Sequence, residues 1–200
     1  GDLIYPDDSR ALPSLKALAE SGIRNLKLGY FVYKPREDNY LAYVDKIRRA
    51  FDGWQMLSRE YGVKICYHTH CGPCMGLNGA ALATLLKDFD PECIGAYIDP
   101  AHLAVNGEDF DFALSMLKDH LALVALKDVL MIREEKNGHG SVRLDWVRAG
   151  VGMVDWTLVF SELRRIGYGG VCSVHCEFEV PEGEFIRAVG KEVEFFRKHL

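Results

Sequence analysis

The feature that most constrains this chain is a regular alternation of short apolar segments with longer amphipathic ones. The apolar segments have the length of β-strands, and the longer ones repeat apolar residues three or four positions apart, as α-helices do. Strands are predicted at 23–31, 63–67, 94–98, 121–126 and 170–176, with a further strand end at 3–5. Helices are predicted at 9–21, 40–61, 79–87, 111–117, 155–166 and 184–198, and a long loop at 131–152. Such βα repetition indicates a parallel sheet with helices packed outside it.

The length of the chain limits how many βα units it can hold. A complete (β/α)8 barrel takes about 250 residues, roughly 31 per unit, so the 200 residues here correspond to about six units. We therefore predict an α/β fold, a (β/α)8 TIM barrel that lacks its first one or two βα units. No linker, low-complexity segment or tandem repeat divides the sequence, so we expect one domain over residues 1–200. An open, doubly wound six-stranded sheet is the structural alternative.

Charge and hydropathy narrow the class of function. The 24 basic and 29 acidic residues are well mixed and give a net charge of −5, which disfavours a nucleic-acid binder with its basic face. No uncharged apolar run of about 18 residues is present, so no transmembrane helix is expected. The chain begins with Gly1 and shows no signal-peptide pattern, so we expect a fragment of a longer cytoplasmic protein with six reduced cysteines.

Polar side chains gather at the predicted carboxyl ends of four successive strands. They are His68, Thr69 and His70; Asp99 and His102; Lys127 and Asp128; and His175, Glu177 and Glu179. Strand ends of parallel α/β folds meet at one edge, and imidazoles with carboxylates there suit Mn²⁺, Co²⁺, Zn²⁺ or Fe²⁺. Each position also has an ordinary alternative: a hydrogen-bonded structural histidine, an Asp99 that caps a turn, or a local ion pair between Lys127 and Asp128.

Several of these segments resemble motifs of the xylose isomerase-like TIM-barrel family. Residues 99–102 are similar to its D-x-x-H, and residues 126–128 to the end of its H-x-K-D. Residues 150–156 are similar to its G-x-G-x-x-D-W, and residues 167–170, leading to Glu177, to its G-Y-x-G…E. The resemblance runs from Leu3 to Leu200 and implies that barrel strands one and two are absent. The family includes sugar phosphate isomerases and epimerases, inosose dehydratases and endonuclease IV-type enzymes.

The resemblance implies a divalent metal cation, of Mn, Co, Zn, Fe or Mg. Epimerases of the family usually hold it by Glu, Asp, His and Glu, of which the Asp matches Asp99 and the last Glu matches Glu177. His68 stands where the family has its first Glu, and Ala125 stands where it has its His. The candidate metal ligands are therefore His68, Asp99, His102 and Glu177, with His70 or His175 also able to fill the vacancy. The change at Ala125 leaves a degenerate, non-catalytic carbohydrate-binding barrel open as an alternative.

The implied activity is a sugar or sugar-phosphate isomerase or epimerase that moves a proton next to a carbonyl. Glu177 would be the base, His68 the opposite acid or base, and Lys127 would offset charge on an oxyanion or phosphate. His70, His102 and His175 would bind a sugar or polyol substrate. We expect no nucleic-acid or membrane partner, and a homo-oligomer is compatible with the family. The tip of the predicted loop, residues 134–141, could act as a lid.

Two other reactions are compatible with local features. The pair His68-Thr69-His70 resembles the H-x-H of inosose dehydratase-like members, so a dehydratase is one alternative. Residues 71–74 read C-G-P-C, the dithiol motif of thioredoxin-like proteins, and a helix beginning there would lower the pKa of Cys71. A thiol–disulfide oxidoreductase acting through Cys71 and Cys74 is therefore a further alternative, although βα repetition surrounds the motif. Zinc bound by Cys71, Cys74 and His70, or two ordinary loop thiols, are the remaining interpretations.

Overall fold

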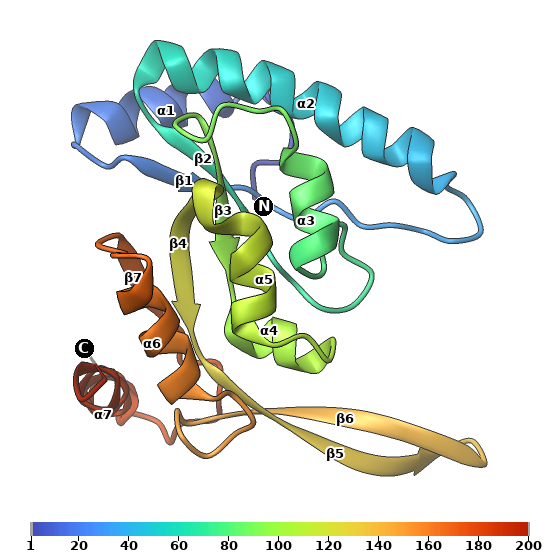
Figure 1. Ribbon diagram of the computed structural model, residues 1–200, viewed down its shortest axis with the longest axis vertical. Helices are drawn as coiled ribbons and strands as arrows, with labels where there is room; N and C mark the ends of the chain where they lie inside the picture. The colour runs from blue at the N-terminus through green and yellow to red at the C-terminus, as the bar shows by residue number, and fades with distance from the viewer. Residues whose placement is uncertain (1, 200) are drawn as a thin grey trace.

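The computed structural model describes residues 2–199 and shows a curled parallel sheet flanked by helices (Figure 1). The sheet has five strands in the described chain. In spatial order they are β1 (Asn25–Lys27), β2 (Lys64–His68), β3 (Ile94–Ile98), β4 (Leu121–Leu126) and β7 (Val171–Val174), each parallel to its neighbour. Two further strands, β5 (Asp128–Lys136) and β6 (His139–Val147), form a separate antiparallel hairpin.

Helices connect the strands. They are α1 (Ala11–Glu20), α2 (Tyr40–Tyr61), α3 (Gly79–Leu86), α4 (Pro100–Val105), α5 (Phe110–Leu117), the 3₁₀ helix η1 (Lys118–His120), α6 (Trp156–Arg165) and α7 (Phe185–Arg197). None of them is long and apolar enough to cross a lipid bilayer within residues 2–199.

The order of the strands separates the two predicted architectures. In the five-stranded sheet the spatial order follows the chain order, so the sheet winds in one direction only. A doubly wound sheet would instead reverse direction at a switch point. The barrel prediction is confirmed in the form of a half-barrel, whose edges β1 and β7 have no further strand beside them in the described chain.

The long helix α2 shows how the sequence defines an element. The side chain of Asn39 accepts a hydrogen bond from the backbone N–H of Ala42, which caps the amino end. Gly62 adopts φ 64° directly after the helix, a left-handed conformation that ends it. The buried face packs on the sheet and consists of Val44, Ile47, Ala50, Phe51, Trp54 and Ser58. The predicted apolar stripe is correct except at its start, because Leu41 is exposed.

Two sheet predictions at the amino end are wrong in detail. Residues 3–5 do not form a strand, although the carbonyl of Leu3 accepts a hydrogen bond from the backbone of Gly29. The predicted strand 23–31 shrinks to Asn25–Lys27, because it pairs on one side only and bends away beyond Leu28.

The predicted loop at 131–152 is largely the β5–β6 hairpin. Asn137 and Gly138 both have positive φ, which is the conformation of a two-residue hairpin turn. Met131 pairs with Leu144 and Val129 with Trp146, so one face of the ribbon is apolar. The ribbon projects beyond the helices (Figure 1), so residues 134–141 do not lie over the sheet as a lid would.

The inner face of the sheet carries the chemistry. Side chains alternate along each strand, and Cys66, Tyr97, Leu123 and Ala125 form a small buried cluster on this face, separate from the main core beneath the helices. Two residues beyond three of these positions lies a polar residue: His68, Asp99 and Lys127 follow Cys66, Tyr97 and Ala125. Because side chains alternate along each strand, these polar residues lie together on the inner face, at the carboxyl ends of the strands.

Candidate functional site

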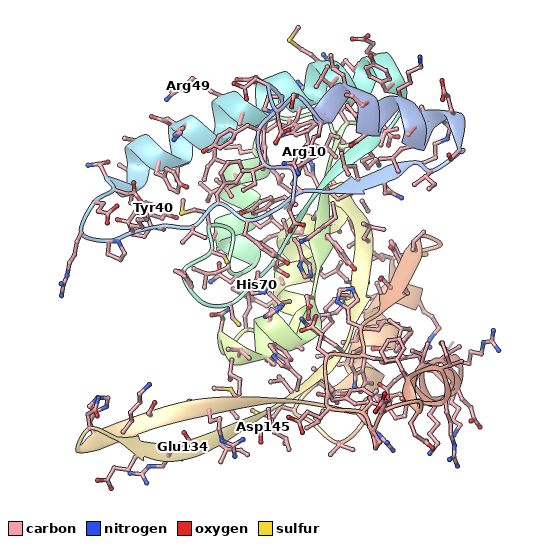
Figure 2. The ribbon with its side chains drawn as sticks, turned by 180° about the vertical axis from the view of Figure 1, so that it is seen from behind. Arg10, Tyr40, Arg49, His70, Glu134 and Asp145 are labelled. Carbon is pink, nitrogen blue, oxygen red and sulfur yellow. The ribbon has the colours of Figure 1, made fainter. Side chains whose placement is uncertain are left out.

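A cavity of about 780 Å³ runs along the inner face of the sheet, from residues 22–25 at the amino end of β1 and Val171 at the start of β7 to the carboxyl ends of the strands. Its walls include six side chains used below: Tyr30, His68, His70, Lys127, His175 and Glu177. Asp99 and His102 are completely buried beneath it. Figure 2 shows His70 among the side chains gathered between the sheet and the hairpin. Predicted residues from four separate strand ends are thus brought together, whereas Asp128 and Glu179 do not line this cavity.

Asp99 has two tasks, one for each carboxylate oxygen. Its Oδ1 accepts hydrogen bonds from the backbone N–H groups of Ala101 (2.9 Å) and His102 (3.2 Å), which caps α4. Pro100 follows as the first helical residue, where its missing N–H costs nothing. The carboxylate is held firmly by this cap, so that Oδ2 points toward the neighbouring strands.

Three buried polar atoms converge where Oδ2 points. They are Asp99 Oδ2, His68 Nε2 and His102 Nε2, and none has a hydrogen-bond partner in the described part of the chain. His68 Nε2 lies 3.3 Å and His102 Nε2 lies 3.7 Å from Asp99 Oδ2. Unpaired buried polar atoms are rare because each loses its contact with water without compensation.

Two of the three pairs in this atom set, each including Asp99 Oδ2, have the spacing of ligands on a divalent metal ion. Ligands at about 2.0–2.2 Å from a tetrahedral zinc are separated by about 3.3–3.6 Å, close to the two distances observed. The second nitrogen of each histidine also has a partner: Tyr30 Oη lies 2.6 Å from His68 Nδ1, and Cys71 Sγ lies 3.1 Å from His102 Nδ1. Metal-binding histidines commonly have such partners, which fix the ring and leave Nε2 free. The residues present therefore fit a metal, with Ala125 contributing no ligand.

Lys127 joins the two predicted carboxylates. Its Nζ lies 3.4 Å from Asp99 Oδ2 and 2.9 and 3.0 Å from the two oxygens of Glu177. It also lies 4.3 Å from the centre of the Trp146 ring, whose edge packs near His102. The alternative of a local Lys127–Asp128 ion pair is wrong, because this buried ammonium faces the site. Both oxygens of Glu177 face Lys127, so Glu177 meets Asp99 through a shared cation.

His175 positions Glu177 from the other side. His175 Nδ1 lies 3.4 Å from Glu177 Oε1, and its Nε2 lies 2.8 Å from the hydroxyl of Tyr97. Tyr97 and His68 also pack ring against ring, with centroids 4.3 Å apart. A chain of contacts therefore links the strand ends of β2, β3 and β7.

The electrostatics keep the carboxylates charged and the imidazoles neutral. Burial would raise the pKa of Asp99, but the contact with His68 and the charge of Lys127 outweigh it and lower that pKa to about 2. The contact with His175, helped by Lys127 and opposed by burial, lowers the pKa of Glu177 to about 2. Burial lowers the pKa of His68 and brings the pKa of His102 to about 3. These are the protonation states in which such groups bind a metal.

The Asp128 carboxylate connects two of the sequence motifs, residues 126–128 and residues 150–156. Its Oδ1 accepts from the backbone of Val129 and Val154, and its Oδ2 accepts from Gly150, Gly152 and the Trp156 indole, at 2.9–3.2 Å. A Cβ at Gly152 would collide with the Asp128 carboxylate, so only glycine fits there. Asp128 therefore fastens residues 150–156 to the end of β4 next to Lys127.

The C-G-P-C segment lacks the features that thiol–disulfide exchange needs. No helix begins at Cys71, because α3 starts only at Gly79. Both Cys71 and Cys74 are buried, and burial raises the pKa of each thiol. The expected helix that would activate Cys71 is thus wrong.

Three residues of the site escape the sequence analysis. Tyr30 lies two positions beyond Leu28, just after β1, where the same strand-end rule could have identified it. Tyr97 is on the inner face of β3 one residue from the strand end and reads as an ordinary core residue. Trp146 reaches the site from β6, and nothing in the sequence indicates that the hairpin folds back there.

Comparisons with known proteins identify the family of this chain. The sequence pattern of the xylose isomerase-like TIM-barrel family matches residues 13–199. An inosose dehydratase of Lactiplantibacillus plantarum is 23% identical over 169 residues, which are 78% of this chain and 54% of that protein. The chain spans about half the length of the curated relatives that it matches.

Solved structures share the fold. The 3-keto-D-glucoside 4-epimerase of E. coli superposes with a TM-score of 0.73 at 16% identity, covering 99% of this chain and 76% of that one. The IolI protein with a bound zinc atom superposes with a TM-score of 0.64 at 19% identity, covering 99% and 74%. With the family pattern matched over nearly its whole length, the chain belongs to the xylose isomerase-like TIM-barrel family.

Proposed function

We propose that this protein is a metal-dependent isomerase or epimerase of sugars or sugar phosphates, which moves a proton on the carbon next to a carbonyl. One observation carries the proposal: His68 Nε2 and His102 Nε2 face Asp99 Oδ2 with no hydrogen bond formed among the three atoms within the described chain, and Lys127 links this carboxylate to Glu177. The epimerase and the zinc-containing structure among the comparisons support it as members of the same fold.

In this proposal His68, Asp99 and His102 hold the divalent cation. A bound cation would polarise the carbonyl and hydroxyl oxygens of a sugar and stabilise the negative charge that develops when the proton leaves. His68 is assigned to the cation rather than to proton transfer, because its Nδ1 contacts Tyr30 and its Nε2 faces Asp99.

Glu177 is the proposed base. It is ionised, it lines the cavity, and its side chain is 43% exposed while Lys127 is buried behind it. Lys127 keeps this carboxylate oriented and adds positive charge where an oxyanion forms. His70 and His175 line the same cavity and would contact the substrate hydroxyls.

Solvent exchange tests the proposal across many sugars at once. The protein, loaded in turn with Mn²⁺, Co²⁺ or Zn²⁺, is incubated in D₂O with a panel of ketoses, aldoses and their phosphates, and NMR follows deuterium at the carbon next to the carbonyl. Glu177→Gln should slow exchange by about 10²-fold or more, because it removes the base. Glu179→Gln, a change two residues away, is the matched control and should not. A metal-loaded protein that exchanges no sugar of the panel would favour the non-catalytic binding barrel.

Dehydration is the second candidate, because an inosose dehydratase is among the sequence relatives. It begins with the same proton removal but continues with loss of a hydroxyl from the neighbouring carbon. The D₂O experiment separates the two reactions. A dehydratase gives a product lighter by one water that absorbs ultraviolet light as a conjugated carbonyl, whereas an epimerase returns a deuterated sugar.

A further inference from the structure

We propose that His70, Cys71 and His102 form a second metal site, which binds Zn²⁺ through one thiolate sulfur and two imidazole nitrogens. One ligand atom from each residue lies within 4.8 Å of the other two. This set is distinct from the cluster around Asp99, because it draws on a cysteine and on the loop after β2. It is called the thiolate site below.

The distances at the thiolate site are those of a site that needs little adjustment. A zinc ion at about 2.3 Å from sulfur and about 2.0–2.1 Å from nitrogen separates the two ligand atoms by about 3.5 Å. Cys71 Sγ and His102 Nδ1 are 3.1 Å apart. His70 closes the set, and its ring lies 3.9 Å from the His102 ring. His70 is half-buried on the loop after β2, and its Nδ1 lies 2.8 Å from the Cys71 carbonyl, a contact that zinc binding through Nδ1 would replace.

The donor types select the metal. A thiolate with two imidazoles suits Zn²⁺ and other thiophilic ions, whereas Mg²⁺ and Mn²⁺ prefer oxygen. Cys71 is 9% exposed and His102 is fully buried, so the site is shielded from water and from competing ligands.

His102 belongs to both clusters through different ring nitrogens. Its Nε2 faces Asp99 Oδ2 at 3.7 Å, and its Nδ1 faces Cys71 Sγ. Zinc at the thiolate site would tie the loop after β2 to the first turn of α4. It would also hold the His102 ring with Nε2 toward Asp99, and with both sites occupied His102 would bridge the two ions as an imidazolate that has lost its ring N–H proton. The thiolate site is thus a structural clamp on the neighbouring cluster, and it can exist whether or not the protein isomerises sugars.

Cobalt substitution tests the site directly. The reduced protein is titrated with Co²⁺, and the near-ultraviolet absorption that arises only from sulfur-to-cobalt charge transfer is recorded, with metal content measured separately. The wild type should show this absorption and Cys71→Ser should lose it. Cys74→Ser changes a thiol that contacts His70 at 3.6 Å but lies outside the three-residue set, and it should keep the absorption; Cys66→Ser, at a buried thiol that contacts none of the three ligands, is the control for general loss of a cysteine. Asp99→Asn should keep it as well, which separates this site from the proposed catalytic one.

A second measurement needs no substitution and so does not depend on the folding of a variant. Alkylation of the wild-type thiols is followed by mass spectrometry with and without Zn²⁺. Zinc should slow modification of Cys71 at least about tenfold, since a coordinated thiolate is not free to react. Absence of the charge-transfer band in reduced wild type, its survival in Cys71→Ser, its loss in Cys74→Ser, or equal alkylation of Cys71 with and without zinc would each overturn the proposal. None of these outcomes bears on the D₂O exchange, so the two proposals fail separately.

Discussion

Asp99 shows how a single residue links the fold to the site. Its Oδ1 caps α4 and its Oδ2 faces His68, His102 and Lys127. The interpretation of Asp99 as a turn cap and its interpretation as a ligand therefore describe two oxygens of one carboxylate. The two interpretations that the sequence allows do not exclude each other.

Two substitutions of Asp99 should separate these tasks. Asp99→Asn keeps an oxygen for the cap but removes the charge, so it should abolish metal binding at the cluster while keeping most of the helix cap. Asp99→Ala should in addition lose the cap, at a further cost of about 1 kcal/mol. Urea unfolding and cobalt binding of both variants measure the two effects. Equal stability of Asp99→Asn and Asp99→Ala would contradict the separate roles of Oδ1 as helix cap and Oδ2 as metal ligand.

The buried histidines predict how stability depends on pH. The folded pKa of His102 is about 3 and that of His68 is also lowered, both through burial, whereas an unfolded histidine titrates near 6.5. Between these values the unfolded chain binds more protons, so stability rises with pH and is lost as pH falls below about 6.5. Through His102 alone, the free energy of unfolding of metal-free protein should fall by roughly 2 kcal/mol between pH 7 and 5, and His68 acts in the same direction. The lowered pKa values of Asp99 and Glu177 act in the same direction, but only below about pH 4.5.

Chemical denaturation at several pH values measures this slope. His102→Gln removes one of the two groups and should make the dependence between pH 7 and 5 shallower. A free energy of unfolding that stays constant over that range would show that the histidines titrate in the folded protein as they do in the unfolded chain.

At the scale of elements, the connection from β4 to α6 depends on the Asp128 clamp. Five donors from Val129 and from residues 150–156 meet this one buried carboxylate. Asp128→Ala should therefore destabilise the protein by at least about 3 kcal/mol, since hydrogen bonds to a charged group are strong and the donors are left unpaired. Asp155→Ala, which removes only the cap of α6, is the control and should cost about 1 kcal/mol. Thermal unfolding compares them, and equal losses would contradict the clamp.

The elements also show what the sequence could and could not predict. Periodicity identifies the helices, apart from the one-and-a-half turns of α4, which are too short to display a period. The hairpin resembles a loop because its outer half is polar, although the Asn137-Gly138 pair is a hairpin signal. The strand-end rule finds His68, Asp99, Lys127 and Glu177, since it follows from the parallel sheet alone. Trp146 depends on how the hairpin packs, which no local pattern encodes.

At the scale of the whole molecule, the half-barrel has two edges that can pair with other strands. β1 and β7 end the sheet, and Val171 on β7 is 54% exposed. Unpaired apolar edge strands favour association between chains. The expected homo-oligomer stays a prediction; in the 200-residue chain taken by itself, these edges can pair with those of another copy.

Val171→Lys tests the edge, because a charged side chain on an edge strand opposes pairing. Light scattering of the 200-residue chain at rising concentration should show less association in the variant than in wild type, with an unchanged melting temperature. Phe112→Lys, at an exposed apolar position on α5 away from the edge, is the control. An equal reduction in both variants would point to general solubility rather than to the edge.

The hydrogen bonds of Asp128 affect which parts of this sequence can vary during evolution. One carboxylate fastens both the start and the end of the segment between β4 and α6, so the distance between the two anchor points does not depend on what lies between them. The outer part of the β5–β6 hairpin, beyond Trp146, can be shortened, extended or replaced without moving Lys127. New specificity can thus arise at the tip of the hairpin while the side chains around Lys127 keep their positions.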